Sequence, residues 1–301
     1  MEIINGHPGE FAALLTALFW TVSALAFESA TLRLGSVAVN ILKLAAGFIF
    51  LTILIYLRRG LILPADAGIE NWLWLTLSGL VGFVFGDLFL FKSYALIGSR
   101  FSMLVMTLVP PMAALFGWII IGEHLTALNF IGMTLTFTGI AMAILTRGGD
   151  NNGRLVMKFA PVGILYALGG AAGQALGLVL SKLGLKDYDP FSATQIRIIA
   201  GMAGFAVLAT FMKRWRHITA AVKDRPGMKS LTIGAFFGPF LGVLFSLISV
   251  KYTKAGIAST IMALTPVFIL IPAIIFFKQK VTFPEFAGAV ISVCGVALFF
   301  I

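Results

Sequence analysis

Charged side chains inside otherwise apolar stretches are the residues of this chain best placed to do chemistry. Lys43, Asp87 and Arg197 each lie within a run that is largely apolar on both sides. A charge at membrane depth is costly unless it is paired or hydrated, so each residue needs a partner or a watery cavity. A cavity of this kind could hold a small polar molecule or pass a proton.

The three charged residues leave more than one role open. Lys43 and Arg197 occupy matching places in the two halves of the chain, which suits either a structural clamp or a pair of cations that sets charge preference. Asp87 has no counterpart, because the matching residue is Val243. Asp87 is therefore either the partner of Lys43 or Lys92 in a buried ion pair, or a group that carries a proton or meets a cation.

Polar and aromatic side chains within or near the ends of the apolar runs extend this set. Asn and Gln in lipid form hydrogen bonds across helices, and a tryptophan in mid-run lies away from the interfacial belt where this residue usually collects. For that tryptophan the alternatives are a cavity wall and ordinary packing. We expect the substrate contacts to come from Trp20, Asn40, Lys43, Asp87, Tyr94, Gln174, Gln195 and Arg197.

Sequence patterns for catalysis, nucleotide binding and metal binding are absent from the chain. His7, His124 and His217 fall in expected loops or end segments, and the single cysteine, Cys294, lies in an apolar run. No HExxH, GxSxG or Walker sequence occurs. We therefore expect no enzyme activity, no metal site, no cofactor and no internal disulfide.

The elements that position these side chains are membrane-spanning helices. The chain has 301 residues, of which 59% are hydrophobic and 11% charged, whereas soluble proteins carry about 25% charged residues. Its apolar runs are continuous and, at ~18 residues or more, long enough to cross a ~30 Å hydrocarbon core. The net charge of +10 lies in short loops between runs, which predicts contact with lipid headgroups rather than nucleic acid.

These runs predict an all-α polytopic membrane protein with ten transmembrane helices. The spans lie at about 9–31, 36–57, 71–94, 100–121, 125–146, 159–183, 190–212, 229–250, 256–278 and 282–301. Glycine ladders mark the third, sixth and eighth spans, and such ladders let helix backbones pack closely in lipid. The ladders are Gly82 and Gly86; Gly169, Gly173 and Gly177; and Gly234, Gly238 and Gly242.

The second half of the chain repeats the first. Residues 82–145 align with 238–301 without a gap, and the glycines and prolines match as well as the apolar residues. The expected division is a first repeat at 1–146, a linker at 147–158 and a second repeat at 159–301. Five spans is an odd number, so the second repeat enters the membrane from the opposite side. Inverted five-helix repeats of this kind are typical of secondary transporters.

Two prolines fall at matching places in the fourth and ninth spans, Pro110 and Pro266. A proline inside a helix cannot donate to the carbonyl one turn earlier, so it kinks the helix or leaves a polar notch. We expect the two prolines to form a symmetrical pair of hinges.

The residues around the fourth and fifth spans also carry a family likeness. They are Pro110, Gly117-Trp118, Gly122-Glu123, Leu125-Thr126, Gly132 and Gly139. With Trp20, Lys43 and Arg197, this pattern resembles the EamA-type members of the drug/metabolite transporter superfamily, over nearly the whole chain. Gln279 and Lys280 depart from the pattern at the corresponding turn of the second half. We expect Glu123 to act locally, as a cap of its turn.

The resemblance implies a ten-helix carrier of small metabolites with a central cavity lined mainly by spans 1, 3, 4, 6, 8 and 9. It also implies cytoplasmic termini, whereas the basic residues clustered at 213–229 favour the opposite orientation. The expected function is secondary active transport, as an exporter of small metabolites such as amino acids, by alternating access in the plasma or inner membrane. A monomer is expected, with the proton as a coupling ion through Asp87. The alternative is a non-transporting membrane scaffold or lipid-binding protein.

Overall fold

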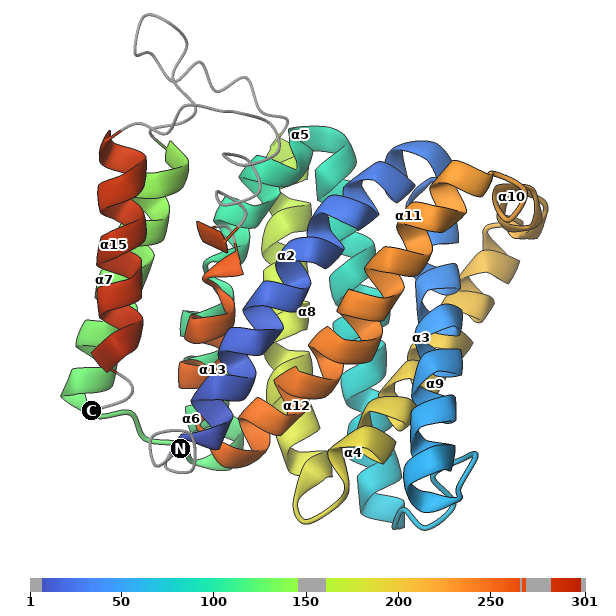
Figure 1. Cartoon of the computed structure of the whole chain (residues 1–301), viewed down its shortest axis with the longest axis horizontal. Helices are drawn as coiled ribbons and strands as arrows, with labels where there is room; N and C mark the ends of the chain where they lie inside the picture. The colour runs from blue at the N-terminus through green and yellow to red at the C-terminus, as the bar shows by residue number, and fades with distance from the viewer. Residues whose placement is uncertain (1–6, 146–160, 266, 269–282, 299–301) are drawn as a thin grey trace, which may run out of the picture.

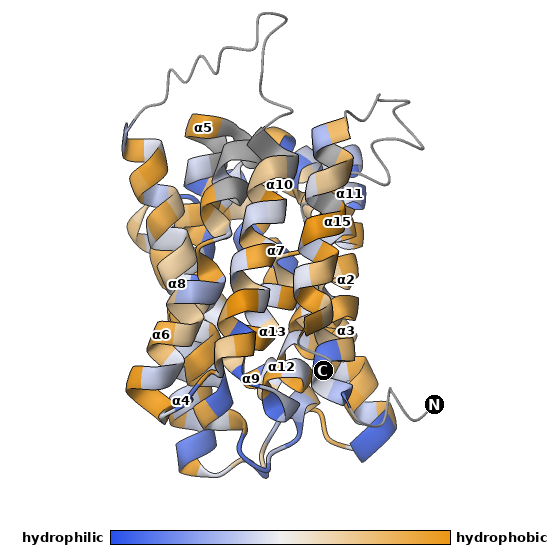
Figure 2. Cartoon of the chain, turned by 90° about the vertical axis from the view of Figure 1, so that its left-hand side faces the viewer, coloured by the Kyte–Doolittle hydropathy of each residue, from blue (hydrophilic) through white to orange (hydrophobic). Residues whose placement is uncertain are grey.

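A computed structural model describes residues 7–145, 161–265, 267–268 and 283–298 of the chain. All regular structure in these ranges is helical (Figure 1). Six of the helices are long and apolar enough to cross a membrane, and shorter apolar helices accompany them. Apolar colour covers most of the helix surfaces, with the strongest hydrophilic colour near the lower end of the bundle (Figure 2). The expected all-helical, multi-span class is confirmed.

The helices run in chain order as follows, with η marking a π-helix: α2 Pro8–Leu34, α3 Ser36–Arg59, α4 Ile69–Gly79, η1 Leu80–Asp87, α5 Leu88–Met106, α6 Val109–Ile121, α7 Ala127–Leu145, α8 Pro161–Leu185, α9 Pro190–Phe211, α10 Trp215–Ala221, α11 Arg225–Ala235, η3 Phe236–Gly242, α12 Val243–Tyr252, α13 Ala255–Met262 and α15 Phe283–Ala297. The first residues of α2 and the last residues of α15 lie at the same end of the bundle (Figure 1).

Two π-helices occur within long helical segments, at matching places in the two halves of the chain. η1 joins α4 to α5, and η3 joins α11 to α12. Their first residues, Leu80 and Phe236, are separated by the same offset that aligns the two halves of the sequence. π-Turns are rare and occur frequently at functional sites. Here Asp87 is the last residue of η1, so the π-turn leads directly into the buried carboxylate.

The segment α5 contains a reversal of the chain. In a straight α-helix, residues nine positions apart are separated by ~13 Å along the axis. The hydroxyl oxygens of Ser93 and Ser102 are nevertheless 2.7 Å apart. The chain must therefore turn back between these serines, which agrees with the boundary expected between the spans at 71–94 and 100–121. The residues after Ser102 then lead into α6.

Turns occur at matching places in the segments expected as the fourth and ninth spans. Residues 107–108 form a turn before α6, and residues 263–264 form a turn after α13. Pro110 lies in the first turn of α6, so it begins a helix rather than kinking one, as its missing N–H allows. Pro266 lies outside the described residues. The Thr265 hydroxyl donates to the carbonyl oxygen of Met262 at 2.8 Å, the carbonyl to which a proline at 266 cannot donate.

Helices of one half pack against helices of the other. α2 packs along α11, η3 and α12, while α8 packs along α4, η1 and α5. α3 packs on α9, α6 on α13, and α7 on α15. The α7–α15 pair stands at one side of the bundle, next to α6 and α13 (Figure 1). Each helix is thus matched with a partner from the other half, which places the cavity described below between the two halves.

The glycine ladders allow two of these helices to meet at very short distance. A Cβ on Gly173 would lie 2.7 Å from the Cα of Gly86, and a Cβ on Gly177 would lie 2.8 Å from the Cα of Gly82. Real Cβ atoms do not approach backbone this closely, so α8 and η1 meet backbone to backbone. The expected close packing of the third and sixth spans is confirmed. The ladder of the eighth span instead receives side chains of α2, with Trp20 against Gly242.

Candidate functional site

A cavity of about 200 Å³ lies among helices of both halves. One water molecule needs only ~10–15 Å³ of such space, so the cavity has room for a small molecule. Its walls come from α2, α3, η1, α5, α8, α9, η3, α12 and α13, and from the turn before α6. Most of the lining is apolar, and a few polar groups converge on it, which is the usual composition of a ligand site.

A buried ion pair occupies one wall of the cavity. The Nζ of Lys43 lies 2.7 Å from Oδ2 of Asp87, and the two side chains are 6% and 10% exposed. The side-chain amide of Gln174, on α8, donates to Oδ1 of Asp87 at 2.6 Å. Both carboxylate oxygens therefore have a donor. Of the two partners considered for Asp87, the structure selects Lys43, while the Nζ of Lys92 lies 5.2 Å from the ring centre of Tyr166.

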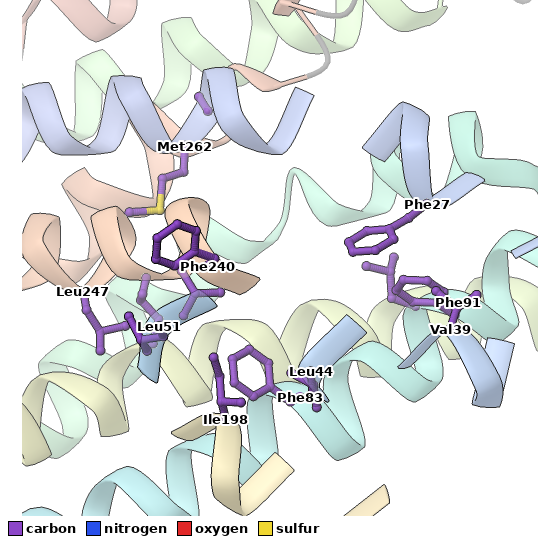
Figure 3. Packing of buried hydrophobic residues seen from close by; sticks show 14 of the residues in the cluster. Phe27, Val39, Leu44, Leu51, Phe83, Phe91, Ile198, Phe240, Leu247 and Met262 are labelled. Carbon is purple, nitrogen blue, oxygen red and sulfur yellow. The ribbon is translucent and has the colours of Figure 1, made fainter. Parts of the chain in front are cut away.

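Aromatic rings enclose the ammonium group of Lys43. Its Nζ lies 4.5 Å from the ring centre of Phe91 and 5.4 Å from that of Phe27. The two rings face each other edge-on with centroids 6.2 Å apart, and they lie side by side in Figure 3. A cation over aromatic faces is stabilised by about 0.5–2 kcal/mol, more when it is desolvated. These rings support a charge that the apolar surroundings would otherwise disfavour.

Arg197 is the second buried cation of the cavity, and its surroundings differ. The residue is 4% exposed, and its guanidinium carbon lies 4.9 Å from the ring centre of Phe83. Among the described residues, its Nε has no hydrogen-bond partner. Buried polar groups are nearly always hydrogen-bonded, so each exception asks for an explanation.

Five of the expected site residues line this cavity: Trp20, Lys43, Asp87, Gln174 and Arg197. They come from four different helices and one π-helix, and the fold alone brings them together. For Trp20, of the two alternatives left open, the cavity wall is the one the structure supports. The side chain of Tyr94 lies outside the described residues.

Two expected site residues lie elsewhere. Gln195 donates from its amide to Oγ1 of Thr52 at 2.9 Å and to the carbonyl of Ile62 at 2.8 Å, which fixes the loop after α3 to α9. Asn40 donates to the carbonyl of Ser36 one turn earlier, at 3.0 Å. Neither side chain is among the cavity-lining residues. Gln195 therefore joins two elements of the bundle, whereas Asn40 bonds within its own helix.

Small hydroxyl residues of the cavity wall were not expected from the sequence. Ser246 and Ser259 both line it. Their hydroxyls donate to carbonyls of their own helices, those of Val243 and Ala255, at 2.7 Å each. A hydroxyl that bonds back to its helix is common in membrane helices, so these residue types alone give little signal. Among the described residues, no cluster of three or more His, Cys, Asp or Glu side chains could hold a metal ion.

A polar network holds the bundle together at the end where α2 begins. Oε1 of Glu123 lies 2.5 Å from Nζ of Lys182, on α8, and Oε2 accepts from the N–H of Ala255, at the start of α13. Lys182 also donates to the carbonyl of Thr253 at 2.6 Å. The Thr253 hydroxyl in turn donates to Glu10, at the start of α2. We call this set, Glu10, Glu123, Lys182, Thr253 and Ala255, the end network.

The expected role of Glu123 as a cap of its own turn is wrong. Thr126 and Asn129 cap the start of α7, because the side chain of each accepts from the backbone N–H of the other. The Glu123 side chain instead crosses to α8 and α13. The sequence shows an acid in a tight turn, but which distant helices that turn reaches depends on tertiary packing.

A second contact at the same end joins the loop after α3 to the turn between α8 and α9. Asp66 accepts hydrogen bonds from Arg59 and from the hydroxyl of Tyr188, at 2.5 and 3.0 Å. Burial raises the pKa of Asp66, but these hydrogen bonds lower it more, so its net pKa lies below the usual value. Burial, with the hydrogen bond to Asp66, raises the pKa of Tyr188 to about 12. This contact is therefore present at neutral pH and is lost only as the pH falls through the lowered pKa of Asp66.

Comparison with known proteins gives these features a family. A model of the EamA-like transporter family matches residues 7–145 and 161–301. An uncharacterized protein of Haemophilus influenzae is 34% identical over 34% of this chain and 75% of its own length. An uncharacterized transporter of Bacillus subtilis, YvbV, is 25% identical over 63% of this chain and 59% of its own length. An uncharacterized transporter of Archaeoglobus fulgidus is 27% identical over 41% and 42%.

A solved crystal structure shows the same fold. It superposes with a TM-score of 0.76 at 18% identity and covers 97% of this chain and 96% of its own. At this identity the likeness concerns the fold alone. The family match, by contrast, extends over both halves of the sequence and leaves out only residues 1–6 and 146–160. The chain is a multi-pass membrane protein that belongs to the EamA-like transporter family.

Proposed function

We propose that this protein is a secondary active transporter of small metabolites, with ten transmembrane helices in two inverted five-helix repeats. The observation that carries the proposal is the cavity, which matching elements of the two halves line in pairs. α2 is matched by α8, η1 by η3, and the interruption before α6 by the one after α13. A substrate site at the interface between inverted repeats, beside discontinuous helices, is the common arrangement of such carriers.

The repeat proposal is supported by the exchange of partners between the halves. α2 packs on the helix that contains η3, and α8 packs on the helix that contains η1. A twofold operation would interchange these two pairs. The reversal between Ser93 and Ser102 supports a fourth span that includes α6, because it converts the long segment α5 into the end of one span and the start of the next. The helix count of ten rests on this reading.

The mechanism we propose is alternating access, in which the end network acts as the closed gate. Glu123 accepts from Lys182 and from the N–H of Ala255, and it thereby joins elements of both halves beneath the cavity. A carrier must break such contacts to open toward that end. Export, proton coupling and a plasma or inner membrane location are kept as parts of this proposal, with amino acids as one example among the small metabolites. A membrane scaffold would need neither a cavity of this kind nor a gate.

Weakening the end network is expected to open the cavity toward that end. Glu123→Gln removes a charged acceptor, and hydrogen bonds to charged groups contribute about 1.5–3 kcal/mol. The ratio of open to closed molecules should therefore rise by roughly tenfold or more. The measurement uses Cys294→Ser with Ser259→Cys as a reporter in the cavity wall, labelled by a membrane-impermeant maleimide added from either side of vesicles.

Glu70→Gln is the matched control for this measurement. Glu70 pairs with Lys186 at the same end, but it is exposed and stands outside the end network. We expect its labelling rate to equal that of the parent. Equal rates for Glu123→Gln and the parent would contradict the gate. Transport itself is tested by counterflow of radiolabelled metabolites in proteoliposomes, and the absence of saturable counterflow for every compound tried would favour the scaffold.

A further inference from the structure

The buried ion pair of the first half has no equivalent in the second. Lys43 and Arg197 occupy matching places on α3 and α9, and each lines the cavity. Lys43 has a carboxylate partner at the end of η1. The matching place after η3 is held by Val243, which lines the same cavity. Under the proposed repeat relation, the second half has no carboxylate at the place that would match the partner of Arg197, although Asp87 of the first half acts on Arg197 electrostatically.

The charges that line the cavity also indicate an unmatched cation. Its charged lining residues are Lys43, Asp87 and Arg197, so the described wall carries a net charge of +1. Both oxygens of Asp87 already accept from Lys43 and Gln174. Arg197 is 4% exposed and its Nε has no hydrogen-bond partner among the described residues. A buried charge is disfavoured unless it is paired, and the planar guanidinium can bind both oxygens of a carboxylate at once.

We propose that the substrate carries a single carboxylate, which binds Arg197 at the position where the second half lacks an acid. This inference rests on the proposed function and names its substrate class. A net charge of +1 is matched by a monoanion, whereas a zwitterionic amino acid brings an ammonium group for which Asp87 has no free oxygen. The rest of the substrate meets an apolar wall that includes Phe83, Val243 and Met262. The class is therefore small monocarboxylates, such as oxo or hydroxy acids, rather than amino acids.

The substitution Val243→Asp tests this idea directly, because it supplies the missing acid from within the chain. The new carboxylate would pair with Arg197, as Asp87 pairs with Lys43, and would exclude a carboxylate ligand. Val243→Asn has a similar volume and no charge, so it serves as the matched control. Arg197→Gln removes the cation itself. If that variant fails to fold, Val243→Asp still decides the question, since it adds a counter-ion to a buried cation.

The experiment measures ligand-induced thermal stabilisation of the purified full chain. The probes are a size series of monocarboxylates from acetate through pyruvate to phenylpyruvate, with L-phenylalanine, phenylalaninamide and inorganic phosphate alongside. A ligand that binds the folded state raises the melting temperature, and the rise grows with the logarithm of ligand concentration over Kd. We expect at least one monocarboxylate to stabilise the parent and Val243→Asn. Its apparent affinity should fall tenfold or more in Val243→Asp and in Arg197→Gln.

Three results would overturn the proposal. They are stabilisation of the parent by no monocarboxylate in the series, stronger stabilisation by phosphate or the zwitterion, and equal monocarboxylate affinity in Val243→Asp and the parent. Failure of the proposed function would look different. Monocarboxylate binding that depends on Arg197, with no counterflow of the same compound, would leave this inference standing and refute transport. Counterflow of a compound that Val243→Asp does not affect would support transport and refute this inference.

Discussion

Replacing Asp87 with asparagine is expected to destabilise the protein by about 3–5 kcal/mol, the usual effect of removing one partner from a buried ion pair. The loss arises because Lys43, 5% exposed, keeps its charge and loses its carboxylate. Asparagine preserves the shape of the side chain, so the loss reports charge rather than volume. Unfolding of the purified protein, followed by heat or denaturant in detergent, measures it.

A double replacement tests whether Lys43 and Asp87 contribute to stability as a pair. Lys43→Met with Asp87→Leu exchanges two paired charges for apolar groups, and such exchanges are often neutral or stabilising. We expect this double variant to recover most of the stability lost in Asp87→Asn. If the double variant loses as much stability as the two single replacements added together, as happens for distant independent sites, Lys43 and Asp87 are not coupled. The recovered variant also tests proton coupling, since pH-driven uptake that survives without Asp87 would remove this residue from the coupling mechanism.

Replacing Gly173 with valine is expected to force α8 away from η1 and to abolish transport. The new Cβ would meet the backbone of Gly86 at 2.7 Å, and backbone cannot rotate aside as a side chain can. Overpacking of this kind typically costs about 1–3 kcal/mol. Gln174 follows Gly173 on α8, and Asp87 follows Gly86 in η1. Their 2.6 Å hydrogen bond would therefore be displaced when the two helices separate.

Gly169→Val is the matched control for this prediction. Gly169 lies one turn earlier on the same helix face, but its Cβ would meet the ring of Phe89, a side chain that can move. We expect a clearly smaller loss of melting temperature and measurable counterflow. The decisive comparison is between the two variants in the same membranes. Similar losses for both would show that the backbone contact at Gly86 has no special importance.

Much of this fold could be predicted because a membrane limits the backbone structures that an apolar run can form. Continuous apolar runs must form helices, and ladders such as Gly173 and Gly177 predict close contact wherever they occur. The burial of Lys43, Asp87 and Arg197 followed from the same argument, since a charge in an apolar run needs a partner or a cavity. The Gly122 turn was also readable, and its left-handed backbone, with φ of 68°, is the conformation that glycine adopts without strain.

The parts that could not be predicted depend on which helices meet. Gln174 and Gln195 are alike in sequence, as amides within apolar runs, yet the first reaches Asp87 and the second fixes a loop. Glu123 reads as a local cap but bonds to α8 and α13. η1 has no clear sequence signal of its own, whereas η3 contains Pro239, which cannot donate the hydrogen bond that a regular α-helix requires. For the two amides and Glu123 the deciding fact is a long-range contact.

The two π-helices also bear on the history of the chain. Two rare turns at equivalent positions are more simply inherited from one ancestral segment than acquired twice. Under the proposed inverted five-helix repeats, the π-turn was already present in a five-helix ancestor, whose copies inserted in both directions and paired as an antiparallel twofold dimer. The valine at 243, in the place that matches Asp87, then arose after gene duplication, when the two copies were free to diverge. Fusion would have converted a symmetrical homodimer into a carrier with two unlike half-sites.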